Sequence, residues 1–197
     1  HDAVPGLITA LKDTEIWVRI SAAQALGGIG EKAHDAVPGL IKVLEDPKGF
    51  VRSGAAYALG RMGEKAHAAV PDLIRALKEP DIEVRSNAAQ ALGQIGEKAH
   101  VAVPDLITAL KDQESLVRSF AAQALGRMGE KAHDVVPALI GTLKDEDMWV
   151  QIKVIQALGS IGPKAKPALV DLETLLNKSP DEEVRTVTKS AIEKIKR

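Results

Sequence analysis

The chain has 197 residues, with 26 Lys and Arg against 27 Asp and Glu, which gives a net charge of -1. This balance offers no bulk attraction for nucleic acid or for an anionic membrane, and the absence of cysteine excludes disulfides and thiol chemistry. The longest apolar runs, such as residues 135–140, are far shorter than the roughly 18 residues of a membrane-spanning helix, and no signal peptide is visible. The default expectation is a cytoplasmic protein with neither a nucleic-acid nor a membrane partner.

A repeat of 33 residues accounts for the whole chain. Within the first five copies the segments A-V-P-x-L-I, V-R-x-x-A-A-x-A-L-G-x-[IM]-G and E-K-A barely change, and no linker separates the copies. The copies occupy residues 1–33, 34–66, 67–99, 100–132 and 133–165, and an altered capping copy occupies residues 166–197. Self-similarity at a fixed period is the sequence signature of a repeat array, so we expect one continuous array rather than separate domains.

The first half of each copy predicts a short helix. In the second copy, Val37, Leu40, Ile41 and Leu44 recur at the spacing of one helix face. Pro38 suits the first turn of that helix, where a missing N–H is least costly.

The second half of each copy predicts a longer helix. In the second copy it follows a turn at Asp46-Pro47, and Gly63 ends it, because a C-terminal glycine readily adopts a positive φ. Its apolar side carries Val51, Ala55, Ala58, Leu59 and Met62. One such hairpin cannot bury its apolar face alone, so we expect the copies to stack.

A glycine recurs inside the second helix of five copies, at Gly27, Gly60, Gly93, Gly126 and Gly159. A glycine inside a helix costs about 1 kcal/mol relative to alanine. Its recurrence indicates that neighbouring helices pack too closely to admit a side chain there.

The period alone fits several families, since ankyrin repeats have about 33 residues and tetratricopeptide repeats about 34. The T-P-L-H signature of the first and the Trp and Tyr anchors of the second are both absent. The segments A-V-P-x-L-I-x-x-L-K-D and V-R-x-x-A-A-x-A-L-G-x-I-G instead resemble the short HEAT-like repeat first associated with phycobilisome lyases. This resemblance implies an all-α fold, an α-α superhelix (solenoid) of six stacked helix–turn–helix repeats. A natural and a consensus-designed member are equally compatible with it.

The variable positions of the repeat gather on one side of the second helix, and all five aromatic residues are among them. Counted from the start of a copy, positions 17, 20, 21, 24 and 28 vary, and at 100° per residue they fall within an arc of about 100°. In proteins of this resemblance the second helices line the concave side, which implies a groove for a protein or peptide. The expected groove residues are Trp17, Ile20, Ser21, Gln24, Phe50, Ser53, Tyr57, Arg61, Glu83, Asn87, Gln90, Leu116, Phe120, Gln123, Arg127, Trp149, Ile152, Lys153 and Gln156.

This mixture of rings with amide, hydroxyl and arginine side chains is typical of protein-binding surfaces. We therefore predict a non-catalytic protein- or peptide-binding scaffold without a cofactor. Two alternatives stay open, a lyase-like subunit that acts on a bilin chromophore and a designed repeat binder with no natural partner. A nucleic-acid-binding solenoid is disfavoured by Glu83 at the centre of the variable line. At position 17 a ring that covers the turn and a ring that binds a partner are not distinguished.

Two ladders of side chains look like chemical sites. His1, His34, His67, His100 and His133 open the first five copies, but equivalent residues of stacked helices lie roughly 10 Å apart, whereas zinc needs its nitrogen ligands at about 2.0–2.1 Å. We expect these histidines to make loop contacts and no metal site. Deoxyhypusine hydroxylase resembles this repeat and holds two irons with His-Glu pairs, which are replaced here by Ser21-Ala22, Gly54-Ala55, Asn87-Ala88 and Phe120-Ala121.

The second ladder consists of Arg19, Arg52, Arg85, Arg118 and Arg185. An acid stands six residues before each of the first four, so we expect structural ion pairs between the repeat turns rather than a phosphate-binding stripe. Gln151 replaces the arginine in the fifth copy, so Asp145 is expected to lack its partner.

The two ends of the array differ. Thr188, Lys189 and Ser190 replace the Ala-Ala-Gln of the repeat, as a polar terminal cap requires. The first copy has the residues of an internal one, so its flank is expected to expose apolar surface. That flank predicts either missing upstream repeats or end-to-end self-association.

Overall fold

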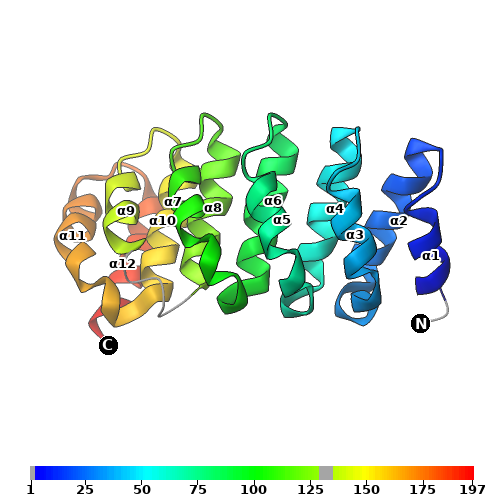
Figure 1. Ribbon diagram of the computed structural model, residues 1–197. Helices are drawn as coiled ribbons and strands as arrows, with labels where there is room; N and C mark the ends of the chain where they lie inside the picture. Colours follow the sequence, from blue (N-terminus) through cyan, green and yellow to red (C-terminus); the bar gives the residue numbers. More distant parts are fainter. Residues whose placement is uncertain (1–2, 129–134) are drawn as a thin grey trace. The chain divides into compact units, whose positions relative to one another are not determined.

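A computed structural model describes residues 3–128 and 135–197 of the chain. The regular elements within these ranges are all helices, and Figure 1 shows them as successive hairpins. They belong to two compact units, His1–Ala102 and Val103–Arg197. This architecture confirms the predicted all-α class built from helix–turn–helix repeats. None of the described helices is long and apolar enough to cross a membrane.

The first unit contains three hairpins. They are α1 (Val4–Ala10) with α2 (Ile16–Ile29), α3 (Val37–Val43) with α4 (Gly49–Arg61), and α5 (Val70–Ala76) with α6 (Ile82–Ile95). Segments of 3₁₀ helix follow each hairpin, at Gly30–Ala36, Gly63–Ala69 and Gly96–Ala102. Pro38 lies in the first turn of α3 as predicted, and Gly63 ends the second hairpin with a φ of 55°.

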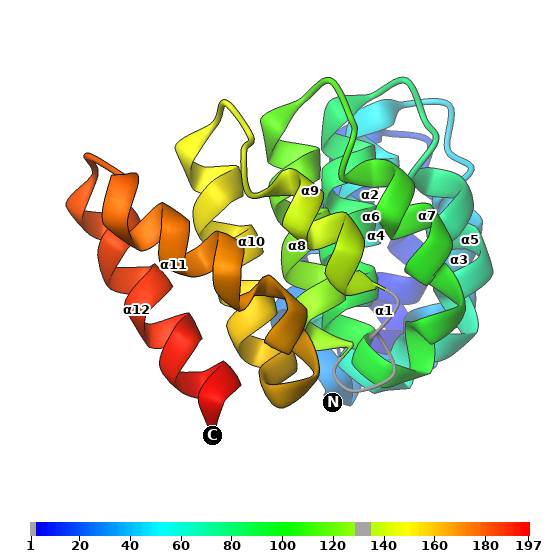
Figure 2. The same ribbon diagram turned by 90° about the vertical axis from the view of Figure 1, so that its left-hand side faces the viewer.

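The second unit repeats the plan. Its helices are α7 (Val103–Ala109), α8 (Ser115–Arg127), α9 (Val136–Thr142), α10 (Met148–Ile161), α11 (Leu169–Lys178) and α12 (Glu182–Lys196), with a 3₁₀ segment at Gly162–Ala168. Figure 2 views this unit from the end that carries α11 and α12. Lys189 and Ser190 of the capping repeat are exposed as predicted. Thr188 is instead buried, and its hydroxyl donates to the Val184 carbonyl at 2.7 Å.

The core lies between consecutive second helices. Within the units α2 packs on α4, α4 on α6, α8 on α10 and α10 on α12, whereas the first helices of neighbouring repeats make few direct contacts with each other. The five residues predicted for the apolar side of the second helix, Val51, Ala55, Ala58, Leu59 and Met62, are all fully buried. The hydrophobic effect therefore acts mainly along the row of second helices.

The recurring glycines allow this close packing, as predicted. A Cβ added to Gly27 would lie 3.1 Å from the Cα of Ala58, and one added to Gly126 would lie 2.6 Å from the Cα of Ala157. Gly60 stands in the same relation to Ala91, at 2.9 Å. A side chain at these positions would push neighbouring helices apart.

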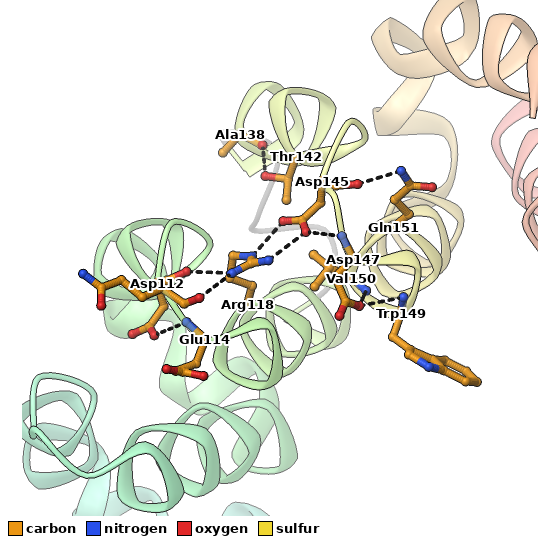
Figure 3. A network of polar contacts seen from close by, with 11 residues as sticks. Asp112, Glu114, Arg118, Ala138, Thr142, Asp145, Asp147, Trp149, Val150 and Gln151 are labelled. Carbon is orange, nitrogen blue, oxygen red and sulfur yellow. Dashed lines mark hydrogen bonds and ion pairs between the residues drawn. The ribbon is translucent and has the colours of Figure 1, made fainter.

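The arginine ladder joins the turns of successive repeats. The Nη1 of Arg118 donates to the backbone carbonyl of Asp112 at 2.9 Å, while its Nε and Nη2 donate to the carboxylate of Asp145 at 2.7 and 2.8 Å (Figure 3). Arg19 and Asp46 make the same pair of side-chain bonds at 2.7 and 3.2 Å. Each of these arginines thus binds its own turn through the backbone and the next turn through a carboxylate.

This geometry corrects two sequence-based expectations. The acid six residues before the arginine offers its backbone carbonyl, and the carboxylate that pairs with the arginine belongs to the following repeat. Asp145 accordingly has a partner, Arg118, although Gln151 occupies the arginine position of its own repeat. The Nε2 of Gln151 donates to the Asp145 carbonyl at 2.7 Å, as the arginines do in the other turns. Stacking brings Arg118 of one turn next to Asp145 of the following turn. Asp145 also closes its own turn, where its Oδ1 accepts the N–H of Asp147 at 2.9 Å.

The environment of this pair shifts both pKa values. Burial raises the pKa of Asp145, but the hydrogen bonds from Arg118 and from the Asp147 N–H, together with the charge of Arg118, outweigh burial and leave that pKa below its ordinary value. The hydrogen bond to Asp145 raises the pKa of Arg118, against the effect of burial. The pair is therefore ionised at neutral pH.

We call an arginine that binds its own turn and the carboxylate of the next turn a clamp. The clamp formed by Arg52 in the first unit is incomplete. Glu79 stands where the other four of the first five repeats have aspartate. It meets Arg52 through one contact, Nη2 to Oε2 at 3.2 Å. The Nε of Arg52 is buried and has no hydrogen-bond partner among the described residues. A buried donor without a partner is unfavourable, because folding removes its water without replacing it.

Candidate binding surface

An open cavity of about 730 Å³ lies across α2, α4 and α6 in the first unit. It brings together side chains from the three second helices of that unit. The lining residues are Trp17, Ile20, Gln24 and Gly28 from α2, Phe50, Ser53, Gly54 and Tyr57 from α4, and Glu83 and Asn87 from α6. The volume falls in the usual range of ligand sites, about 300–1,000 Å³.

The aromatic rings around the cavity are exposed. Trp17 is 76% exposed, Phe50 66% and Tyr57 40%. At the same repeat position in the second unit, Trp149 is 57% exposed, and Figure 3 shows its ring pointing away from the polar network of the turn. The rings at position 17 are therefore largely exposed to solvent and are not buried against the turn.

An aspartate before position 17 fixes the start of some second helices. The carboxylate of Asp81 accepts the N–H groups of Glu83 at 2.9 Å and Val84 at 3.2 Å. Asp147 caps α10 in the same way and accepts the N–H of Trp149 at 2.8 Å. These caps hold the backbone of position 17 in place. The sequence analysis missed them, although an aspartate two residues before position 17 is a recognisable signal.

A polar pair joins two walls of the cavity. The Nδ2 of Asn87 on α6 donates to the Oγ of Ser53 on α4 at 2.8 Å, and Ser53 is only 7% exposed. The carboxylate of Glu83, one turn before Asn87, is exposed to solvent. The carboxylate and the amide thus face the same space as the rings.

Gly28 is a lining residue that the sequence analysis did not include. A Cβ at Gly28 would meet nothing within 4 Å, so no packing constraint requires glycine there. Other copies carry Arg61, Gln94 and Arg127 at this position. The missing side chain widens the cavity at the end of α2. Gly28 could have been recognised in the sequence, because several other copies carry a long side chain at its position.

Position 20 of the fifth copy departs from the predicted surface, whereas Ile20 and Ser53 at the same position line the cavity. Ile152 is 2% exposed, so it belongs to the core and offers no contact to a partner. The reason is its direction on the helix. Ile152 precedes Gly159 by seven residues, about two helical turns, and Gly159 packs against Ala191 of the next second helix. Ile152 therefore faces the neighbouring repeat.

The other predicted residues are accessible to different extents. In the first unit Ser21 and Arg61 are exposed and Gln90 is half-buried, and none of the three lines the cavity. In the second unit Leu116, Arg127, Trp149 and Gln156 are exposed, whereas Phe120, Gln123 and Lys153 are half-buried. These seven residues lie on α8 and α10.

The histidines make local contacts. His34, His67 and His100 are exposed, and the Nδ1 of each donates at 3.1 Å to the carbonyl three residues earlier. His1 and His133 lie outside the described residues. In the ranges that the structure describes, no group of three or more His, Asp or Glu side chains is placed to hold a metal ion.

Family comparisons assign most of the chain to one repeat class. A family model described as HEAT repeats matches residues 4–70 and 103–193, and a second HEAT repeat model matches residues 69–99. No curated protein matches the chain.

Solved structures share its fold. The crystal structure of an engineered protein is 30% identical, with a TM-score of 0.78, and the match covers 100% of this chain and 97% of that one. The complex of CpcE and CpcF of phycocyanin lyase from Nostoc sp. PCC7120 is 27% identical, with a TM-score of 0.73 and coverages of 98% and 77%. Computationally designed armadillo repeat proteins for modular peptide recognition are similar in fold alone, at 21% identity and a TM-score of 0.72 over 96% of this chain and 98% of that one.

Proposed function

The chain belongs to the HEAT repeat family, and we propose that it is a non-catalytic scaffold that binds a peptide or an exposed segment of a protein. The observation that carries this proposal is the open cavity on α2, α4 and α6, with three exposed aromatic rings around it. A soluble domain rarely leaves such rings in water unless they serve an interaction. Aromatic side chains are also the commonest energetic anchors of protein interfaces.

The packing of the helices supports the face formed by the second helices as the binding face. Second helices of consecutive repeats pack directly, whereas first helices make few direct contacts with each other. Each unit therefore narrows toward its second helices, which carry the variable positions. A concave row of helices suits an extended segment, because several side chains of the ligand reach the surface together.

A library of short peptides displayed on phage tests this function. We expect the wild type to enrich peptides whose affinity falls at least about 30-fold in the Trp17→Ala/Phe50→Ala variant, since anchor residues are typically worth about 2 kcal/mol or more. Val101→Ala is the matched control, because Val101 is 57% exposed in the same unit but does not line the cavity. If the wild type and the Trp17→Ala/Phe50→Ala variant enrich the same peptides with equal affinity, the proposed site is contradicted.

The exposed residues of α8 and α10 form a second candidate surface. Leu116 and Trp149 are 49% and 57% exposed, and Arg127 lies on the same variable arc of its helix. We propose that this surface also contacts partners. Trp149→Ala is then expected to weaken binding of some selected peptides without changing the fold, as checked by circular dichroism.

An apolar patch on α1 and α2 supports the proposed self-association. Val18 is 38% exposed, whereas its equivalents Val51, Val84, Val117 and Val150 are fully buried. Sedimentation of the wild type is expected to depend on concentration, and Val18→Lys is expected to remove that dependence. A wild-type protein that stays monomeric at high concentration would contradict self-association.

A role in a bilin lyase is the second candidate, and the similarity to the CpcE–CpcF complex supports it. Mixing the protein with free bilin distinguishes the two functions. The peptide-binding proposal predicts no shift in the absorbance of the bilin, and a saturable shift that Phe50→Ala abolishes would favour the lyase-like role.

A further inference from the structure

The cavity in the first unit has uncharged polar side chains and a single source of formal charge, a carboxylate. Glu83 is the one charged residue among its lining side chains, and no ion pair occupies its carboxylate within the described part of the chain. Asn87 follows Glu83 by four residues on α6, so the two side chains lie next to each other on one face. The amide of Asn87 uses its Nδ2 on Ser53, which leaves Oδ1 as an acceptor.

The aromatic walls favour the same kind of ligand. Trp17, Phe50 and Tyr57 expose their rings around this acceptor pair. The faces of aromatic rings carry partial negative charge and attract cations, most strongly at Trp. An aliphatic stem that carries a cation also packs on exposed rings. Arg61, one turn after Tyr57, is exposed and does not line the cavity.

Other side chains complement these groups less well. A leucine would cover Glu83 and Asn87 without offering them a donor, which is unfavourable for a desolvated carboxylate and amide. An acidic side chain would be repelled by Glu83. An ammonium group satisfies the carboxylate as a point charge, whereas a planar guanidinium stacks on a ring and donates several N–H groups in fixed directions.

We propose that this cavity recognises an arginine side chain of the bound peptide, with the guanidinium donating to Glu83 and to Asn87 Oδ1 and stacking on the rings of Trp17 and Phe50. This assignment rests on the proposed peptide-binding function and specifies its ligand. It makes the first unit selective for basic segments although the whole chain has a net charge of -1.

The test uses fluorescein-labelled pentapeptides of sequence Ser-Leu-X-Leu-Ser in which X is arginine, citrulline, lysine or norleucine, with binding measured by fluorescence anisotropy. Citrulline keeps the shape of arginine and removes its charge. We expect the arginine peptide to bind about tenfold or more tightly than the citrulline peptide, and the lysine peptide to lie between them. In Glu83→Gln the ratio of arginine to citrulline affinity is expected to fall to about two or less.

Glu31→Gln is the matched control. It removes the same charge from an exposed position of the first unit outside the cavity and is expected to preserve the wild-type ratio. Thermal unfolding of both variants verifies that they remain folded. Equal binding of the arginine and citrulline peptides, an equal ratio in wild type and Glu83→Gln, or no binding of any of the four peptides would overturn arginine recognition.

These outcomes are separable from failure of the proposed function. If the selected library peptides lack arginine and still require Trp17 and Phe50 for binding, the proposed peptide-binding site stands. Only its preference for arginine would be overturned. Absence of any library peptide that depends on those rings would overturn the function itself.

Discussion

The two units are built from one repeat and differ at individual joints and in what they expose. In the second unit the Cα of Ala157 lies 2.6 Å from a Cβ built on Gly126, and the two-bond clamp of Arg118 and Asp145 closes the turn. In the first unit the corresponding distances at Gly27 and Gly60 are 3.1 and 2.9 Å. Arg19 and Asp46 also form a two-bond clamp there, whereas the clamp of Arg52 and Glu79 has one contact. The first unit holds the aromatic cavity. The comparison shows that the repeat tolerates joints of different closeness, with the closest helix contact at Gly126 and the weakest clamp at Arg52.

Removing the carboxylate of a clamp should give the largest difference in stability loss between the two units. Asp145→Ala leaves Arg118 buried without its carboxylate, which is expected to lower the free energy of unfolding by about 3 kcal/mol. Glu79→Ala removes one contact from a carboxylate that is 35% exposed, so a loss of about 1 kcal/mol or less is expected. Urea unfolding followed by circular dichroism measures both. Equal losses would show that the clamps do not differ in strength.

Overpacking the helix contact should give the next largest effect. Gly126→Ala places a Cβ against backbone atoms of Ala157 and is expected to destabilise by about 2 kcal/mol, after the gain in helix propensity. Gly27→Ala is expected to cost less, because its nearest backbone atom is farther away. The control is Gly141→Ala in α9, where a Cβ meets nothing within 4 Å; it should stabilise by about 0.5–1 kcal/mol. Thermal melting of the three variants checks this order.

The clamp of the second unit also predicts a dependence on pH. The pKa of Asp145 is lower in the folded protein than its ordinary value, so its stabilising contribution is complete above the unfolded pKa of about 3.9 and is lost as the pH falls through the folded pKa. Asp145→Asn should therefore be less stable than the wild type by roughly 1.5 kcal/mol near neutral pH, and the difference should shrink below about pH 4. A difference that stays constant down to about pH 2 would exclude ionisation of Asp145 as its source.

Completing the loose clamp should give the smallest effect. In Glu79→Asp the shorter carboxylate is expected to reach the Nε and Nη2 of Arg52 together, as Asp46 and Asp145 do with their arginines. Providing a partner for the buried Nε should stabilise the protein by about 1 kcal/mol. A lower urea midpoint than that of the wild type would show that Arg52 does not adopt the geometry of Arg19 and Arg118.

The repeat pattern predicted the helices and most of their cores, because apolar periodicity and glycine punctuation are local signals. Pro38, Gly63 and the five apolar residues of the second helix lie as predicted. The direction of the arginine clamp was not predictable in this way, because Arg118 and Asp145 are 27 residues apart in sequence and meet only after the repeats stack.

The same limit applies to the candidate site. The period of the helix placed position 20 on the variable arc, yet Ile152 lies at the edge of that arc and is covered by the next repeat. Gly28 was missed because a glycine contributes to a cavity through the side chain that it lacks. Exposure of the rings at position 17 depends on the packing around the turn, which a single helix wheel does not show.

The central claim is that the aromatic residues belong to the variable surface and not to the conserved core. Urea unfolding of the Trp17→Ala/Phe50→Ala/Trp149→Ala variant tests it without knowledge of any partner. Because the three rings are 57–76% exposed, the account predicts a free energy of unfolding within about 1 kcal/mol of the wild type. A loss of about 3 kcal/mol or more, typical of deleting a buried aromatic side chain, would show that the rings stabilise the fold and would contradict the account.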